Sequence, residues 1–212
     1  MAKFAGLIFD LDGTLSDSVP MILKSSESTH AKMGIPWDAA AVARFIGRPL
    51  YETGVYFAPD RVDEYIETFR EFNMVYLPKM IKPFPGVVSL LAKLQDSGME
   101  LAIVTSRLQW GADWSAEILG IQSYFTAIMG VEASDKHKPD PEPALLALDK
   151  LGVAPAEAAF IGDAAVDIAC GKAAGMTTIG VSWGVGGTAL QEDAKPDYFV
   201  NSVNELGRLL LL

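Results

Sequence analysis

Residues 9–18 read FDLDGTLSDS, and they follow a short apolar segment, FAGLIF, at residues 4–9. An apolar run of this length predicts a buried β-strand, and the glycine at position 13 predicts where the strand breaks. Because residues two apart in extended backbone point the same way, Asp10 and Asp12 are expected on one side of the chain. Gly13 permits a tight turn and a close backbone approach to a ligand. The stretch therefore brings two carboxylates to the end of a core strand.

Short apolar segments rich in Ile, Val and Phe recur along the rest of the chain. They are ELAIVTS at 100–106, YFTAIMG at 124–130, AAFIGD at 158–163 and TTIGVS at 177–182. Patterns with helical spacing separate most of them, at residues 86–97, 111–119, 141–151 and 165–174. Non-alternating apolar strands that alternate with helices are typical of a parallel sheet covered on both faces. We therefore predict an α/β fold with a three-layer, doubly wound, Rossmann-like parallel sheet.

The interval from residue 16 to residue 83 breaks this alternation. It offers helical patterns only, at residues 17–33, 38–46 and 60–79, with the loop IGRPLYETGVYFAPD between the last two. A helical block inserted after the first strand is expected to form a cap domain, with a hinge where Pro83 and Pro85 restrict the backbone. The predicted domains are an α/β core of residues 1–15 and 84–212 and a helical cap of residues 16–83.

The composition narrows the class of protein. A net charge of −10 and a pI near 4.6 argue against a nucleic-acid partner, so an anionic substrate would need local cations. Cys170 is the only cysteine, which excludes a disulfide framework and fits a reducing compartment. No run approaches the roughly 20 apolar residues of a membrane helix, and Asp10 interrupts the apolar N-terminus, unlike a signal peptide. We expect a cytoplasmic protein with a small-molecule substrate and no membrane partner.

Polar residues close the predicted strands at the edge where ligands of open parallel sheets bind. In chain order these residues are Asp10, Asp12, Thr105, Ser106, Lys138, Asp163 and Asp167. Taken singly, each has a structural explanation as a turn former, a helix N-cap or a surface residue. Their order and their shared place at one edge favour a common site instead. Crowded carboxylates would repel one another without a cation, and oxygen ligands with open water positions suit Mg²⁺.

This set of groups suits phosphoryl transfer. One carboxylate near a phosphorus atom can act as the nucleophile, which forms an acyl phosphate and divides one hard step into two. A second carboxylate can protonate the leaving oxygen and then activate water. Lys138 and the hydroxyl of Thr105 would bind the oxygens of the transferred phosphoryl group.

The same residues carry a family resemblance that covers nearly the whole chain. Four segments resemble, in order, the four motifs of the haloacid dehalogenase superfamily: DLDGTL at 10–15, IVTS at 103–106, KPDPEP at 138–143 and IGDAAVD at 161–167. The resemblance implies that Asp10 is the nucleophile and Asp12 the general acid and base. It also implies an Mg²⁺ site of Asp10, the backbone carbonyl of Asp12 and Asp163, supported by Asp167, and a phosphate site of Thr105, Ser106, Lys138 and Gly13.

Departures from the family pattern indicate which branch the chain resembles. The dehalogenase branch lacks a carboxylate at the position of Asp12, so the resemblance favours phosphoryl chemistry. Related phosphosugar mutases usually have a histidine at the position aligned with Ile22, and its absence counts against a mutase. His30 lies too far along the chain to replace it, and we interpret His30 as a surface residue. Residues 138–184 resemble phosphoglycolate phosphatases. Three other segments resemble bacterial inorganic pyrophosphatases of this superfamily: FIGRPLYET, VDEYIETFREFN and KPDYFVNSVNEL.

Substrate choice is expected to depend on the cap, because the core motifs handle only the phosphoryl group. Arg48, between Gly47 and Pro49, is the candidate ligand for an anionic leaving group such as a glycolate carboxylate. Arg107 stands where both phosphatase groups commonly have a lysine, and the two cations differ in shape and donor geometry. The predicted function is an Mg²⁺-dependent phosphatase for 2-phosphoglycolate. An inorganic pyrophosphatase is the alternative in the same class, and a non-catalytic binding module is the alternative in another.

Overall fold

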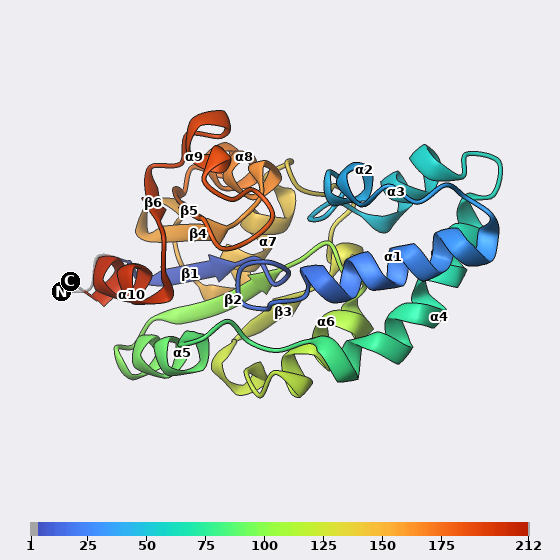
Figure 1. Cartoon of the computed structure of the whole chain (residues 1–212). Coiled ribbons are helices and arrows are strands. Elements are labelled where there is room, and N and C mark those ends of the chain that lie inside the picture. The colour runs from blue at the N-terminus through green and yellow to red at the C-terminus, as the bar shows by residue number, and fades with distance from the viewer. Residues whose placement is uncertain (1–3, 212) are drawn as a thin grey trace.

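Six parallel strands form one sheet in the computed structural model, which describes residues 4–211 (Figure 1). The strands are β1 (Gly6–Phe9), β2 (Glu100–Val104), β3 (Ala127–Met129), β4 (Ala158–Gly162), β5 (Thr177–Val181) and β6 (Tyr198–Val200). Their order across the sheet is β3-β2-β1-β4-β5-β6, so the first strand lies in the middle and the chain crosses to either side of it. The predicted doubly wound parallel sheet is confirmed, and β6 adds an edge strand to the five that the sequence indicates.

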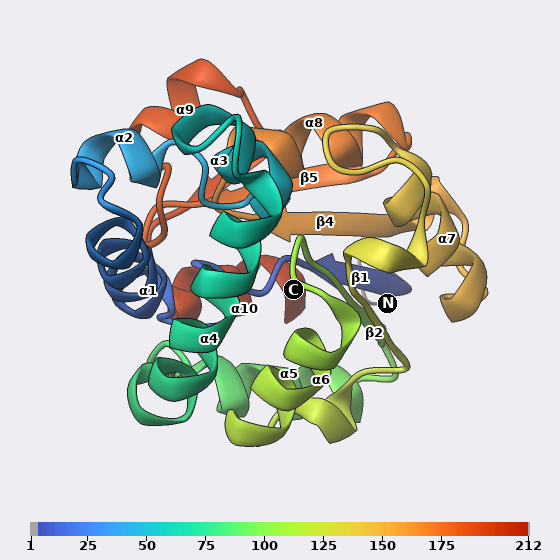
Figure 2. The same ribbon diagram turned by 90° about the vertical axis from the view of Figure 1, so that its right-hand side faces the viewer.

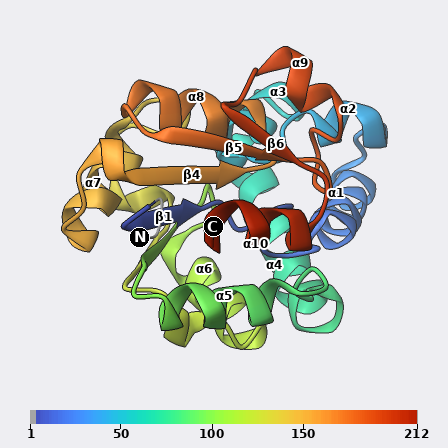
Figure 3. The same cartoon turned by 90° about the vertical axis from the view of Figure 1, so that its left-hand side faces the viewer.

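The helices of the α/β part cover both faces of the sheet (Figure 3). They are α5 (Val87–Asp96), α6 (Gln109–Ile118), α7 (Glu142–Leu151), α8 (Ala165–Ala173), α9 (Ala189–Asp193) and α10 (Val203–Leu211). Leu7 and Phe9 of β1 belong to an apolar cluster with residues of α5 and α10, whereas Ile8 belongs to a cluster with residues of α7 and α8. Alternate residues of one buried strand thus contribute to two cores. Within residues 4–211 no helix is both long and apolar enough to cross a membrane.

Between β1 and α5 the chain forms a block of helices (Figure 1, Figure 2). These helices are α1 (Val19–Met33), α2 (Ala39–Ala43), α3 (Leu50–Phe57) and α4 (Val62–Met80). α1 and α4 pack along each other, and the block lies beyond the carboxyl ends of the strands. We call residues 19–80 the helical insert. The division of the chain into a core of residues 1–15 and 84–212 and a cap of residues 16–83 stays a proposal.

One segment of the insert that the sequence pattern predicts as a loop is helical. Residues 46–60 contain α3, which begins after Pro49 and includes Gly54. A glycine inside a helix lowers its intrinsic stability, and this is why the local pattern favours a loop. In the structure Gly54 is buried, and a Cβ at this position would lie 3.1 Å from Val62 of α4. The close packing of α3 on α4 explains the glycine and outweighs its low helix propensity.

The prediction that His30 is a surface residue is wrong. Its side chain is fully buried inside the insert. Nδ1 lies 2.9 Å from the carbonyl oxygen of Pro36, and Nε2 lies 3.2 Å from the hydroxyl of Tyr65. The rings of Trp37 and Phe57 pack edge-on against the imidazole. His30 therefore joins α1 to α4 and to the loop after α1, and its role is structural.

Candidate active site

β1 ends in the middle of the sheet, and this position gathers the polar residues that follow its two neighbours. Asp10 continues the ladder after β1, because its N–H donates to the carbonyl of Ile161 in β4 at 2.9 Å. Thr105 follows β2 directly, and Asp163 follows β4 directly. The structure therefore brings these side chains together at the carboxyl edge of the sheet, below the helical insert.

A buried lysine joins two of the carboxylates. Lys138 Nζ lies 2.6 Å from Asp10 Oδ1 and 2.7 Å from Asp167 Oδ1. Its third donor faces the carbonyl oxygen of Val104 at 3.3 Å. Burial opposes the charge of the ammonium group, but the two carboxylates outweigh this effect and raise the pKa of Lys138. Lys138 is thus a fixed cation that orients Asp10, and it must exchange one of these acceptors in order to bind a phosphate oxygen.

Three buried carboxylates lie close together beside this single lysine. Oxygen atoms of Asp10, Asp163 and Asp167 lie within 4.8 Å of one another. Asp10 Oδ2 is buried and has no hydrogen-bond partner among the residues that the structure describes. Burial, followed by repulsion from Asp167, raises the pKa of Asp163 to about 7. Burial also raises the pKa of Asp10, against the attraction of Lys138. A cluster of oxygen ligands with this deficit of positive charge fits a divalent cation.

Two loops hold Asp163 in place: the turn after Asp12, and the loop after β5, which the sequence analysis did not single out. Thr14 Oγ1 donates to Asp163 Oδ1 at 3.0 Å, and the backbone N–H of Val185 donates to Oδ2 at 2.6 Å. A Cβ at Gly13 would lie 2.3 Å from Asp163 Oδ2, and a Cβ at Gly184 would lie 2.1 Å from the same oxygen. Both positions need glycine because the carboxylate occupies the space that a side chain would take. Gly13 thus approaches Asp163 closely, and its predicted approach to a bound phosphate stays a prediction.

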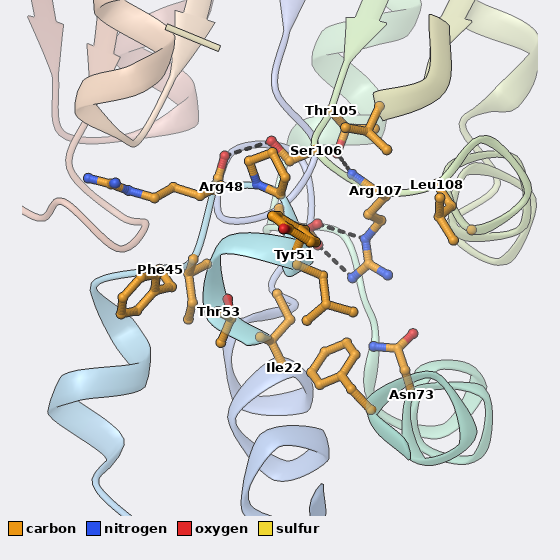
Figure 4. Close-up of a pocket in the computed structure, with 18 of the residues that line it drawn as sticks. Ile22, Phe45, Arg48, Tyr51, Thr53, Asn73, Thr105, Ser106, Arg107 and Leu108 are labelled. Atoms are coloured by element: carbon orange, nitrogen blue, oxygen red, sulfur yellow. Dashed lines mark hydrogen bonds and ion pairs between the residues drawn. The ribbon is translucent and has the colours of Figure 1, made fainter. Parts of the chain in front are cut away.

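Asp12 forms a bidentate ion pair with Arg107 (Figure 4). Arg107 Nε donates to Asp12 Oδ2 and Arg107 Nη2 donates to Asp12 Oδ1, each at 2.7 Å. Ser18, the residue before α1, also donates its hydroxyl to Asp12 Oδ1. The planar guanidinium makes two parallel bonds that a lysine at this position could not make. The Asp12 carboxylate is therefore held toward the pocket and does not belong to the carboxylate cluster.

The two hydroxyls after β2 have different surroundings. Thr105 is buried, and its Oγ1 accepts the N–H of Arg107 at 3.3 Å, while no acceptor for its own proton is found within residues 4–211. Ser106 Oγ donates to the carbonyl of Gly47 in the insert at 2.7 Å (Figure 4). Thr105 thus has a hydroxyl proton to offer a phosphate oxygen, whereas the side chain of Ser106 ties the core to the insert. The phosphate-binding roles of both residues stay predictions.

A pocket of about 270 Å³ lies between the carboxyl edge of the sheet and the helical insert. Asp10, Asp12 and residues 105–108, 110 and 111 are among the core residues that line it, and mostly apolar side chains of the insert line the opposite side. Arg48 is also part of the lining, but its half-exposed guanidinium pairs with Glu52 at 3.3 Å and points away from Arg107 (Figure 4). For the predicted role of Arg48 in specificity, its guanidinium must turn from Glu52 into the pocket.

Comparisons with known proteins agree on one family. The family model of haloacid dehalogenase-like hydrolases matches residues 7–181. Pyrophosphatase PpaX of Bacillus velezensis is 34% identical over 206 residues, which cover 96% of this chain and 95% of that protein. The structure of a haloacid dehalogenase-like hydrolase of Streptococcus pneumoniae matches with a TM-score of 0.86 at 28% identity, over 97% of this chain and 98% of that one. A Lactobacillus plantarum protein provisionally described as a phosphoglycolate phosphatase matches with a TM-score of 0.88 at 26% identity, over 99% of this chain and 100% of that one.

Proposed function

This chain belongs to the haloacid dehalogenase-like hydrolases and is a phosphatase, and we propose that it hydrolyses a small substrate through a phosphoryl intermediate on Asp10, with Mg²⁺ as cofactor. The first candidate substrate is 2-phosphoglycolate. Inorganic pyrophosphate has equal support, because the Bacillus relative is named as a pyrophosphatase. The observation that carries the proposal is the buried Oδ2 of Asp10, which lies in the pocket lining beside Lys138 and has no hydrogen-bond partner within residues 4–211. A cytoplasmic location is part of the proposal and rests on the sequence alone.

Asp10 and Asp12 have different proposed roles. Asp10 Oδ2 attacks phosphorus while Lys138 holds Asp10 Oδ1. Asp12 donates a proton to the leaving oxygen and then accepts a proton from the water that hydrolyses the acyl phosphate. Lys138 and the hydroxyl of Thr105 bind the phosphoryl oxygens and offset their negative charge during the transfer.

Both oxygens of the Asp12 carboxylate accept bonds from the guanidinium of Arg107, and we propose that Arg107 moves when substrate binds, which frees Asp12 to meet the leaving oxygen. An anionic group on a substrate offers the guanidinium another acceptor in the same pocket. Movement of Arg107 from Asp12 to such a group would couple substrate binding to release of the general acid. This coupling favours substrates with an anionic leaving group, a class that includes both candidates.

The proposed cofactor fits the carboxylate cluster. Asp10, Asp163 and the backbone carbonyl of Asp12 would hold it, and Asp167 would support the site. Mg²⁺ supplies positive charge there, which balances the carboxylates and polarises the phosphoryl group. Asp167 already pairs with Lys138 at 2.7 Å, so we expect its support to be indirect.

Removal of divalent metal with a chelator is expected to lower kcat by about 100-fold or more, because the lost charge is worth several kcal/mol to the transition state. Added Mg²⁺ should restore activity, and Ca²⁺ should restore it poorly because its coordination is larger and looser. A chromogenic phosphate ester at constant ionic strength gives the measurement. Full activity in chelator would contradict the metal assignment.

A substrate profile of the purified protein tests the proposed function. Phosphate release is measured from 2-phosphoglycolate, inorganic pyrophosphate, sugar phosphates and nucleotides at one concentration of free Mg²⁺. We expect 2-phosphoglycolate or pyrophosphate to have the highest kcat/KM. The Asp10→Asn variant, purified in the same way, controls for contaminating phosphatases. Preference for a sugar phosphate or a nucleotide would overturn the proposed substrates.

Arg48→Ala is expected to lower kcat/KM for 2-phosphoglycolate. The corresponding loss of transition-state stabilisation is about 1.5 kcal/mol, the lower end of the range for a charge-assisted hydrogen bond. The effect is at the lower end because Arg48 must first leave Glu52. A small ester without a carboxylate should lose much less. Glu52→Gln is the control, since it frees Arg48 and should not lower activity. An equal loss for both substrates would mean that Arg48 is structural or binds the phosphoryl group.

A further inference from the structure

The pocket lining contains a cation for which residues 4–211 provide no partner. Arg70 of α4 lines the pocket, and its Nε is buried without a hydrogen-bond acceptor among the residues described. None of the ion pairs found within residues 4–211 includes Arg70. By contrast, Arg48, Arg61 and Arg107 each pair with a carboxylate. Because buried polar groups in folded proteins almost always have partners, the exception needs an explanation.

The face of α4 that lines the pocket carries no carboxylate that could pair with Arg70. This face is formed by Ile66, Phe69, Arg70 and Asn73. The spacing of three and four residues places them in one stripe along the helix. The acidic neighbours of Arg70 on α4, Glu67 and Glu71, are exposed, and Glu71 pairs with Lys32 of α1. The helix itself therefore does not neutralise the guanidinium.

The rest of the described pocket lining does not neutralise it either. The carboxylates in that lining are Asp10 and Asp12. Asp10 already pairs with Lys138, and Asp12 already pairs with Arg107. A partly buried cation among apolar side chains is unfavourable unless an opposite charge or a hydrogen-bond acceptor meets it. An anionic group on a ligand would supply both.

Such a group would lie in the pocket between the core and α4, whose lining includes both Arg70 and Arg107. The guanidinium of Arg107 extends into the pocket from the core, and Asn73 faces it from α4 (Figure 4). A substrate whose phosphorus lies at Asp10 places its leaving group in the space between the core and α4. We propose that Arg70 binds the anionic end of that leaving group, a carboxylate or a phosphate, an assignment that rests on the proposed phosphatase function. The pocket thereby selects substrates that carry negative charge at both ends.

The test compares three non-hydrolysable acids as inhibitors of chromogenic ester hydrolysis. 3-Phosphonopropionate carries a carboxylate, methylenediphosphonate carries a second phosphonate, and methylphosphonate carries neither. The wild-type protein is expected to bind at least one diacid more tightly than methylphosphonate. Arg70→Met keeps much of the apolar stem of the side chain without its charge. It should therefore weaken binding of that diacid about 10- to 100-fold and leave the affinity for methylphosphonate nearly unchanged. The diacid that loses affinity shows whether a carboxylate or a phosphate meets Arg70.

Arg44→Met is the matched control, because Arg44 is an exposed arginine of the same insert and its loss changes the net charge equally. Its inhibition constants should equal those of the wild type. Arg70→Lys should recover part of the diacid affinity, since it restores the charge without the planar fork. Thermal unfolding of each variant verifies that it is folded, and Arg70→Gln replaces any variant that is not.

Two outcomes would overturn the assignment. If Arg70→Met weakens binding of the diacids and of methylphosphonate equally, Arg70 contacts the phosphoryl group or has a structural role. If it weakens binding of none of them, Arg70 does not bind a charged group of the ligand. Failure of the proposed function has a different signature. A wild-type protein that cleaves neither 2-phosphoglycolate nor pyrophosphate excludes those substrates but leaves the inhibitor comparison intact. If the chromogenic ester is not cleaved either, calorimetric titration with the same three acids gives the comparison.

Discussion

The Asp10→Asn variant is expected to lose turnover of every phosphorylated substrate by about 10⁴-fold or more, because it removes the nucleophile while it keeps the size of the side chain. In the structure Asp10 Oδ2 is buried without a partner among the described residues, and Lys138 holds Oδ1 at 2.6 Å. An amide at this position cannot form the acyl phosphate. Intact-mass spectra of the variant, quenched during turnover, should therefore show no phosphate adduct.

Asp12→Asn is the contrasting variant in the same experiment. It loses proton donation to the leaving oxygen and activation of water, each worth about 10²- to 10⁴-fold. A chromogenic ester with a good leaving group needs little protonation, so it should still phosphorylate Asp10. The acyl phosphate should then persist, because its hydrolysis needs the missing base. The proposed metal contact of position 12 is its backbone carbonyl, so Mg²⁺ affinity should stay near that of the wild type.

Asp17→Asn is the matched control for both variants. Asp17 is the next acidic residue of FDLDGTLSDS, but it lies 3.6 Å from the exposed ammonium of Lys82 and outside the pocket lining. Its neutralisation should leave turnover unchanged. A phosphate adduct on Asp10→Asn would refute the nucleophile assignment, and normal steady-state turnover by Asp12→Asn would refute the acid and base assignment.

The sheet edge that carries the site is predictable from sequence, because residues 4–13 contain both the apolar pattern of a buried strand and the carboxylates that follow it. The four residues of β1 are all buried, and Asp10 follows them immediately. Parallel strands end at one edge, so the residues after β2 and β4 must lie near Asp10 once the sheet is predicted. Thr105 and Asp163 are found there for this reason. Lys138 comes from the loop before α7, and its long side chain reaches Asp10.

Contacts between distant residues account for what the sequence does not show. Thr14 and Asp163 are 149 positions apart, and the indole of Trp183 donates to the carbonyl of Thr14 across 169 positions. The glycine-rich segment WGVGGT at 183–188 has the composition of a tight loop, but nothing in it indicates that the loop closes around a carboxylate. Arg70 illustrates the same limit, since an arginine in a charged helical pattern usually faces solvent. Only the packing of α4 over the pocket gives it another environment.

Lys138→Met is expected to lower the free energy of unfolding by about 3–5 kcal/mol, because it leaves two carboxylates buried without their shared cation. Lys138 Nζ lies 2.6 Å from Asp10 Oδ1 and 2.7 Å from Asp167 Oδ1, and all three side chains are almost fully buried. Methionine retains most of the apolar stem, so loss of packing contributes little. Urea unfolding in the presence of chelator measures the effect, since a cation bound by the same carboxylates would replace part of the lost charge.

Lys136→Met is the matched control for this substitution. Lys136 lies two positions earlier, and its exposed ammonium is 3.5 Å from Asp140. Exposed pairs of this kind contribute about 0–1 kcal/mol, so its removal should change stability little. A loss as large as that of Lys138→Met would attribute the effect to the loop and not to the buried charge.

The double variant Lys138→Met with Asp167→Asn separates charge balance from catalysis. Neutralising Asp167 removes one of the two carboxylates that Lys138 pairs with, so the double variant should be more stable than Lys138→Met alone, and the two effects should not add. Turnover should not recover, because Asp10 still lacks the cation that orients it, and kcat should stay about 10²- to 10³-fold below the wild type. Recovery of both stability and kcat would show that Lys138 is a structural counter-ion only. Unchanged stability in Lys138→Met would show that the folded protein does not need this cation to hold the two carboxylates.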